Sequence, residues 1–207
     1  ILAPSERFSI LFGFPFTSLK NSPQTVRGLS DIYFQTETAL YMHETSDFYM
    51  YTSLIVGLFF PNGKTGQGKN VTTPYIGGTT NYNTNHLYAF GVWMFIPSTT
   101  KNNIKSGSTF YYEGGFGIPI IFKEKFLSAF IFQLNGQYSE NETVRTVLYE
   151  TTGAKVIWVG PTIQIMTSNL KFQAGAQYPI SNQVVNPSRP KDKFRMGLGI
   201  SYYTVFG

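Results

Sequence analysis

Cysteine is absent from the 207 residues of this chain, and charged residues make up only 13% of it. Without cysteine the chain can form neither disulfides nor thiolate metal sites. No apolar run approaches the ~18 residues that a membrane-spanning helix requires, and the mean hydropathy is only −0.09. The opening residues, ILAPSERFS, lack the basic segment and apolar stretch of a secretory signal. We therefore expect that any such signal has been removed or lies outside this sequence.

Aromatic residues and glycine are abundant instead, with 19 Phe, 14 Tyr and 20 Gly. The charged fraction lies well below the ~25% of typical soluble domains. Transmembrane β-barrels have this composition, because polar residues that face the lumen dilute the hydropathy of the strands. The length predicts a single domain over residues 1–207.

The C-terminal stretch KFRMGLGISYYTVFG, residues 193–207, shows strand periodicity most clearly. Successive side chains of a strand point to opposite faces. One alternate set is mostly apolar and the other is mostly small or polar: Phe194, Met196, Leu198, Ile200, Tyr202, Thr204 and Phe206 against Arg195, Gly197, Gly199, Ser201, Tyr203 and Val205. The stretch exceeds the ~5–6 residues of an ordinary strand. It suits a tilted strand that crosses a membrane, which needs about 9–11 residues.

Similar alternation predicts further strands near residues 7–16, 29–43, 48–60, 71–81, 86–96, 108–121, 126–138, 155–166 and 170–180. The segment 71–81 contains Pro74, which a central strand tolerates poorly. It is included because short and long connections then alternate along the chain, as in outer-membrane barrels. The long connections are expected near 17–28, 61–70, 98–107, 138–153 and 182–192, where 139–153 is either a loop or an extension of the strands.

The fold predicted is all-β: a transmembrane antiparallel β-barrel of about ten strands in an up-and-down meander. A missing upstream pair of strands would make twelve. The outward sets of the nine clearest strands contain no Asp, Glu, Lys, Arg or His. A charge that faces lipid at mid-membrane costs roughly 2–4 kcal/mol for Arg or Lys. A soluble β-sandwich or lipocalin-like barrel is the alternative, but its outer face should carry many charges.

The inward sets contain the charged residues Asp31, Glu37, Glu113, Lys171 and Arg195. Closure of a barrel would make its first and last strands neighbours, so Glu37, Lys171 and Arg195 are expected in one patch. Two interpretations stay open: an ion-pair and amide network that fills a narrow lumen, which we favour, or a charged constriction that selects solutes. Bulky inward candidates are Trp93, Trp158, Tyr33, Tyr41, Tyr49, Tyr51 and Tyr111.

The expected outer loops are basic and contain Lys64, Lys69, Lys101, Lys105, Lys191 and Lys193. Such residues can pair with lipopolysaccharide phosphates, or they can simply form a soluble surface. Nucleic-acid binding is disfavoured, because these charges lie on separate loops with no binding module around them.

Three segments carry a resemblance to a known family: LSDIYFQTETALYMH, SLIVGLFFPNGKTG and a strand that contains FGVWMF. Their Ser-Asp-Ile opening and Pro-x-Gly strand end resemble outer-membrane barrels of the meta-pathway phenol-degradation, or transporter, family. Phe60 departs from the family pattern before Pro61. The likeness covers about residues 30–120 and extends weakly beyond them. It implies an outer-membrane channel or the transport of hydrophobic compounds, and it supplies no catalytic residues.

An enzyme is disfavoured, because the chain has only two histidines, His43 and His86, and neither has an Asp beside it. No cofactor or metal is expected. The sequence predicts an integral outer-membrane barrel that acts as a narrow passive channel or transport protein for small or hydrophobic solutes. The alternative is a non-conducting structural barrel, as a homo-oligomer or as part of a larger outer-membrane assembly.

Overall fold

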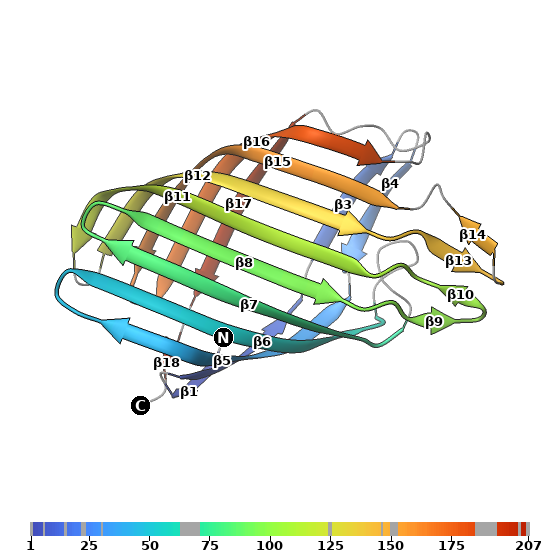
Figure 1. Cartoon of the computed structure of the whole chain (residues 1–207), viewed down its shortest axis with the longest axis horizontal. Helices are drawn as coiled ribbons and strands as arrows, with labels where there is room; N and C mark the ends of the chain where they lie inside the picture. The colour runs from blue at the N-terminus through green and yellow to red at the C-terminus, as the bar shows by residue number, and fades with distance from the viewer. Residues whose placement is uncertain are drawn as a thin grey trace.

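The computed structural model is all-β and describes residues 2–5, 7–14, 16–21, 24–29, 31–62, 71–123, 126–145, 147–149, 153–184, 194–202 and 204–205. Ten long strands follow one another in chain order and pair antiparallel, which confirms the predicted meander (Figure 1). They are β2 (Phe8–Gly13), β5 (Ile32–Glu44), β6 (Phe48–Phe60), β7 (Thr73–Thr84), β8 (Tyr88–Ile96), β11 (Thr109–Lys123), β12 (Phe126–Ser139), β15 (Ala154–Thr167), β16 (Leu170–Val184) and β17 (Arg195–Tyr202). The described residues contain no helix that could cross a membrane.

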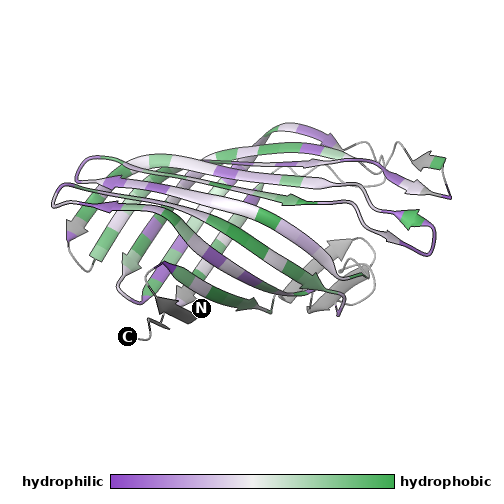
Figure 2. Cartoon of the chain, turned by 60° about the horizontal axis from the view of Figure 1, so that its bottom comes forward, coloured by the Kyte–Doolittle hydropathy of each residue, from purple (hydrophilic) through white to green (hydrophobic). Residues whose placement is uncertain are grey.

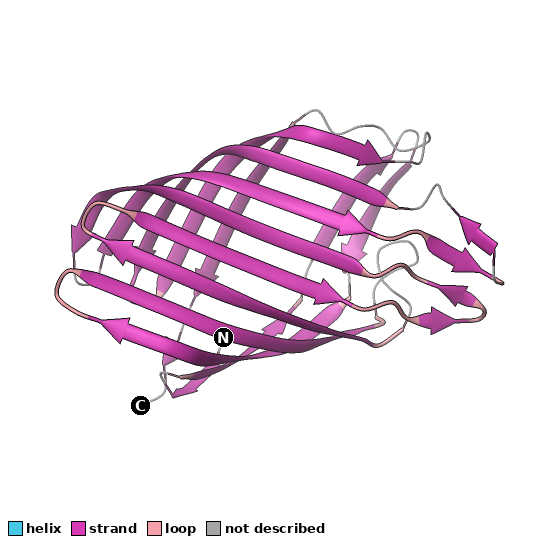
Figure 3. Ribbon diagram, in the orientation of Figure 1, coloured by secondary structure: helices cyan, strands magenta, loops and turns pink. Residues whose placement is uncertain are grey.

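The two ends of this sheet lie close together in the chain. Its hydrogen-bonded order begins with β17 and ends with β18 (Thr204–Val205), and one residue separates these two strands. β18 pairs parallel with β1 (Leu2–Ser5), which pairs antiparallel with β2. Over the described residues, backbone pairing therefore leaves the sheet open between β17 and its other end. The tilted strands curl, so that some pass behind the others in Figure 3.

Two of the predicted loops form strands instead, and the segment 139–153 contains strands, which was one of its two predicted alternatives. Residues 17–28 were expected to be a loop, but β3 (Phe16–Asn21) and β4 (Gln24–Leu29) make a hairpin there. The expected loop at 98–107 contains β9 (Thr100–Lys101) and β10 (Ile104–Lys105). Within 139–153, β13 (Glu142–Val144) and β14 (Val147–Tyr149) pair with them in a second sheet of order β14-β13-β10-β9. Most of the other two long connections, residues 63–70 and 185–193, lies outside the described part of the chain.

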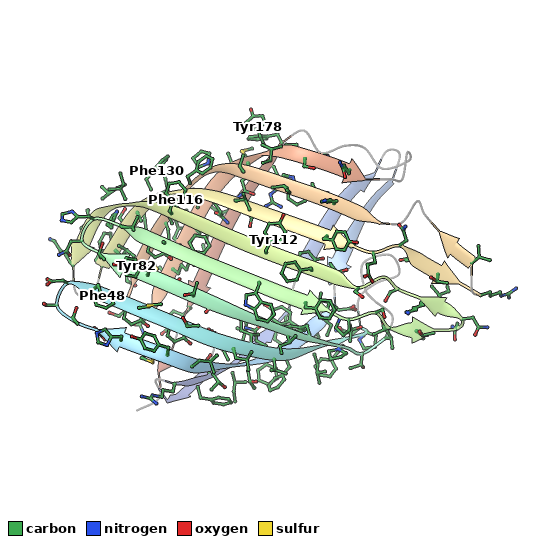
Figure 4. The ribbon with its side chains drawn as sticks, viewed as in Figure 1. Phe48, Tyr82, Tyr112, Phe116, Phe130 and Tyr178 are labelled. Atoms are coloured by element: carbon green, nitrogen blue, oxygen red, sulfur yellow. The ribbon has the colours of Figure 1, made fainter. Side chains whose placement is uncertain are left out.

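Burial in the main sheet is inverted relative to a water-soluble protein. Large apolar side chains are exposed, including Met196 at 79% and Leu198 at 73%, whereas polar Gln164 and Thr162 are 1% and 3% exposed. The alternation is visible along the strands in Figure 2. Figure 4 shows Phe116, Phe130 and Tyr178 projecting away from the ribbon. The face with the buried polar residues is called the inner face below, and the opposite one the outer face.

Two of the bulky residues expected to point inward lie on the outer face instead. Tyr41 was expected to point inward, but a bulge between Ala39 and Tyr41 shifts the register, and Tyr41 is 50% exposed. Trp93 was also placed inward and is 41% exposed. Because β8 is apolar on both faces, hydropathy could not orient it. The pairing of Val92 with Glu113 determines the orientation of β8. Directly paired residues share a face, so Val92 lies on the inner face and Trp93 on the outer one.

The reversed orientation of β8 creates a small apolar cluster on the inner face. Tyr88, only 6% exposed, packs there with buried Leu127, Ala129 and Ile131. Phe90 and Met166 contact the same cluster. The inner face is therefore polar in its larger part and apolar around Tyr88.

Two inner-face glycines test how tightly these strands pack. A methyl group at Gly117 would overlap the carbonyl oxygen of Phe130, whereas at Gly197 it would meet nothing within 4 Å. We expect Gly117→Ala to lower the free energy of unfolding by about 1–3 kcal/mol, because the backbone of β12 must move. Gly197→Ala should change it by about 0.5 kcal/mol or less. Urea titration followed by circular dichroism measures both, and equal values for the two variants would contradict this packing.

Candidate functional site

A hydrogen-bonded network of amides covers the inner face from β11 to β17, with Gln133 at its centre. The Gln133 Nε2 donates to Glu113 Oε1 at 2.7 Å. The Gln133 Oε1 accepts from Thr162 Oγ1 at 2.7 Å and from Gln173 Nε2 at 3.3 Å. One side chain thus joins four neighbouring strands, β11, β12, β15 and β16. Strand alternation produces this arrangement by presenting one polar side chain per strand at each level.

Arg195 enters the same network from β17. Its Nε donates to Gln177 Oε1 at 2.6 Å, and its guanidinium carbon lies 4.2 Å from the ring centroid of Trp158. Contact with the π face stabilises the cation where water is partly excluded. Trp158 is itself buried, as its inward assignment predicted.

Asn135 connects Arg195 to Glu113. When its amide is oriented to suit its neighbours, the nitrogen donates to Glu113 Oε2 at 2.9 Å. The Asn135 oxygen then accepts from Arg195 Nη2 at 3.1 Å. Lys171 and Arg195 both act electrostatically on Glu113. Two cations therefore act on this carboxylate, and hydrogen-bonded amides hold one of them, Arg195, in place.

A cavity of about 390 Å³ opens beside this network. Its lining consists of network side chains and five consecutive residues of β17: Glu113, Gln133, Asn135, Thr162, Gln173, Gly175, Gln177 and Arg195 to Gly199. The charges in the lining are one carboxylate and one guanidinium. Gly197 and Gly199 leave room in it, because an added Cβ at either position would meet nothing within 4 Å.

Glu37 lies in a different cluster, on β5 to β7. Its Oε1 accepts hydrogen bonds from Ser53 Oγ, from Tyr51 at 3.2 Å and from Thr79 at 3.3 Å. The rings of Tyr49 and Tyr51 stack nearby, with centroids 6.4 Å apart. The predicted patch of Glu37, Lys171 and Arg195 depends on closure of the sheet and stays a prediction. The contacts of Glu37 described here are to hydroxyl groups, whereas Lys171 and Arg195 act on Glu113.

Three of the other predicted charged residues, Asp31, Lys101 and Lys105, lie in the described part of the chain. Asp31 is buried immediately before β5. Lys101 and Lys105 are exposed on β9 and β10. Lys64, Lys69, Lys191 and Lys193 lie outside the described residues, so their predicted contact with lipopolysaccharide stays a prediction.

Lys105 has an acidic neighbour in Glu140. The backbone N–H of Ser108 donates to Glu140 Oε2 at 3.2 Å. Hydrogen bonds from Ser108, and to a smaller degree the charge of Lys105, lower the pKa of Glu140 below its ordinary value. The ionised form is the one that makes this contact. Its stabilisation is therefore present above the ordinary pKa and is lost as the pH falls through the lowered one.

Within the described ranges, no group of three or more His, Asp or Glu side chains is arranged to hold a metal ion. His43 packs its ring against Phe48, with centroids 5.1 Å apart. Sequence reasoning had selected charged residues and passed over the amides at the centre of the network. The available signal was the recurrence of Gln at inward positions of β12, β15 and β16, at 133, 164, 173 and 177.

A scan against models of protein families finds none that matches this chain. A search of curated proteins gives no significant match either. The resemblance to the phenol-degradation transporter family therefore stays a prediction.

The network should depend strongly on Gln133. Gln133→Ala removes the partner of three side chains and leaves buried polar groups unsatisfied, so we expect a loss of about 1–3 kcal/mol in the free energy of unfolding. Gln183→Ala, at an exposed position of β16, should stay within about 0.5 kcal/mol. Denaturant titrations of both variants give the comparison. A Gln133→Ala protein as stable as its control would show that the amides contribute little.

Proposed function

We propose that this protein is an integral outer-membrane β-barrel through which small solutes pass. The observation that carries the proposal is the inverted burial of the main sheet. Exposed apolar residues such as Ile118, Met196 and Leu198 suit contact with lipid, and the buried amides suit a polar lumen. A protein that folds in water would have the opposite arrangement, with apolar side chains buried and polar ones exposed, because burial of apolar surface is the main driving force of folding in water.

The position of the two ends of the main sheet supports closure of the sheet into a barrel. β17 and β18 are the two ends of the hydrogen-bonded order, yet one residue separates them in sequence. A membrane has no water to satisfy the free edge of a strand, so only closed sheets are stable there. The even count of ten long strands is also the rule for bacterial barrels of a single chain.

The composition of the inner face supports passage of solutes over a purely structural role. Its polar network is charge-balanced and lies beside a cavity of about 390 Å³. A filled barrel with no path would instead anchor a larger assembly, as a homo-oligomer or with other proteins. Lipid and, at the basic outer strands, lipopolysaccharide are the surroundings we propose for the barrel itself.

Two isoleucines separate a membrane barrel from a soluble sheet. Ile118 is 69% exposed on β11 and Ile104 is 47% exposed on β10, outside the main sheet. We expect Ile118→Arg to cost roughly 2–4 kcal/mol in lipid, because it places a charge against hydrocarbon. Ile104→Arg should be harmless. Folding yield into liposomes, followed by urea titration, measures both. Equal tolerance of the two changes would fit a soluble sheet and would contradict the proposal.

Conductance in a planar bilayer tests passage directly. We expect stable channels from the purified protein, and Glu113→Gln should lower the preference for cations, because Arg195 and Lys171 then lose their balancing charge. Glu142→Gln, on β13 outside the main sheet, is the matched control and should leave the reversal potential unchanged. Folded protein that stays electrically silent would favour the structural barrel.

A further inference from the structure

We infer that the cavity beside β17 binds neutral polyhydroxylated solutes of the size of a mono- or disaccharide. This inference rests on the proposed function and adds the class of solute. Its volume of about 390 Å³ lies within the ~300–1,000 Å³ of small-molecule sites. Three features of the lining favour this class: its charge, its hydrogen-bonding groups and its glycines.

The charges of the lining favour a neutral solute. Glu113 and Arg195 are of opposite sign, and Asn135 bridges them with hydrogen bonds of 2.9 and 3.1 Å. An anion or a cation would meet one like charge in the same wall. A zwitterion would have to displace the bridge and the stacking of Arg195 on Trp158, which is 4.2 Å away. Breaking such charge-assisted contacts is costly.

The hydrogen-bonding groups favour hydroxyls over apolar surface. A sugar hydroxyl both donates and accepts, as does a side-chain amide. Gln173 donates to Gln133 through Nε2 at 3.3 Å, which is one of the four hydrogen bonds that an amide side chain can make. Each oxygen of Glu113 accepts one amide bond, so both keep a second lone pair. An apolar solute would cover these groups without replacing their bonds to water, which costs free energy.

The glycines make the wall approachable. Gly197 and Gly199 are inner-face positions of β17, and a Cβ there would meet nothing within 4 Å. The main chain between them therefore borders the cavity directly, together with the intervening Leu198.

The test is a titration of the conducting protein with sucrose in a planar bilayer. We expect a saturable fall in conductance beyond the effect of viscosity, and no such fall with the zwitterion glycylglycine at equal concentration. Gln173→Leu should raise the sucrose concentration needed for half-maximal block roughly fivefold to tenfold, which is the effect of one lost hydrogen bond. Gln137→Leu, an inner-face change of the same kind outside the cavity lining, should leave it unaltered.

Calorimetric titration of the wild-type protein with sucrose in detergent micelles needs no conductance and separates the two proposals. Sucrose binding by an electrically silent protein would support this inference while the channel proposal fails. Channels that sucrose does not block, with no heat of binding, would overturn this inference and leave the channel proposal standing. Equal block by glycylglycine, or by sucrose in Gln173→Leu and wild type alike, would also overturn it.

Discussion

A polar side chain that is buried on one face of a sheet needs a hydrogen-bond partner in the protein. Burial removes its contacts with water, and a buried donor or acceptor without a partner costs about 1–3 kcal/mol. The inner face of this protein meets that requirement through Gln133, whose amide serves Glu113, Thr162 and Gln173 together. The positions of Glu113 and, through Asn135, of Arg195 follow from it. The network also joins strands that are far apart in sequence.

The outer face depends on the same alternation of side chains. Each strand that presents an amide inward presents an apolar residue outward, as Gln164 and Ile163 do on β15. The exposed residues continue from strand to strand, and an apolar surface of this extent is unusual on a monomeric protein in water. A hydrocarbon environment removes its cost and at the same time strengthens the hydrogen bonds of the interior. The two faces would therefore support each other in the membrane that we propose for this protein.

Local pattern predicted much of the fold but little of its pairing. The strand at Phe48–Phe60 has the predicted bounds, because alternation and turn residues delimit it on both sides. The inward assignment of Tyr41 was wrong because of a bulge. A bulge reverses which face the following side chains point to, and hydropathy does not reveal it. The inward assignment of Trp93 was wrong because both faces of β8 are apolar, so hydropathy could not distinguish them. The hairpin of β3 and β4 was missed because its sequence is polar, and hydrogen bonds between two chain segments can order a polar segment without any apolar stripe.

The site shows the same limit. Inward positions of Glu37, Glu113, Lys171 and Arg195 followed from parity, whereas the partner of each depends on which strands lie side by side across the inner face. As a result, two carboxylates of the inner face, Glu37 and Glu113, have different surroundings. Glu37 is held by neutral hydroxyls of β6 and β7, so its charge remains uncompensated by these contacts. Glu113 has two cations, Lys171 and Arg195, acting on it. In a narrow lumen the field near Glu37 would attract cations, and the neutral wall at Glu113 would leave recognition to hydrogen bonds. In the channel that we propose, Glu37 would therefore attract cations at one side of the lumen, and the wall at Glu113 would bind uncharged solutes at the other.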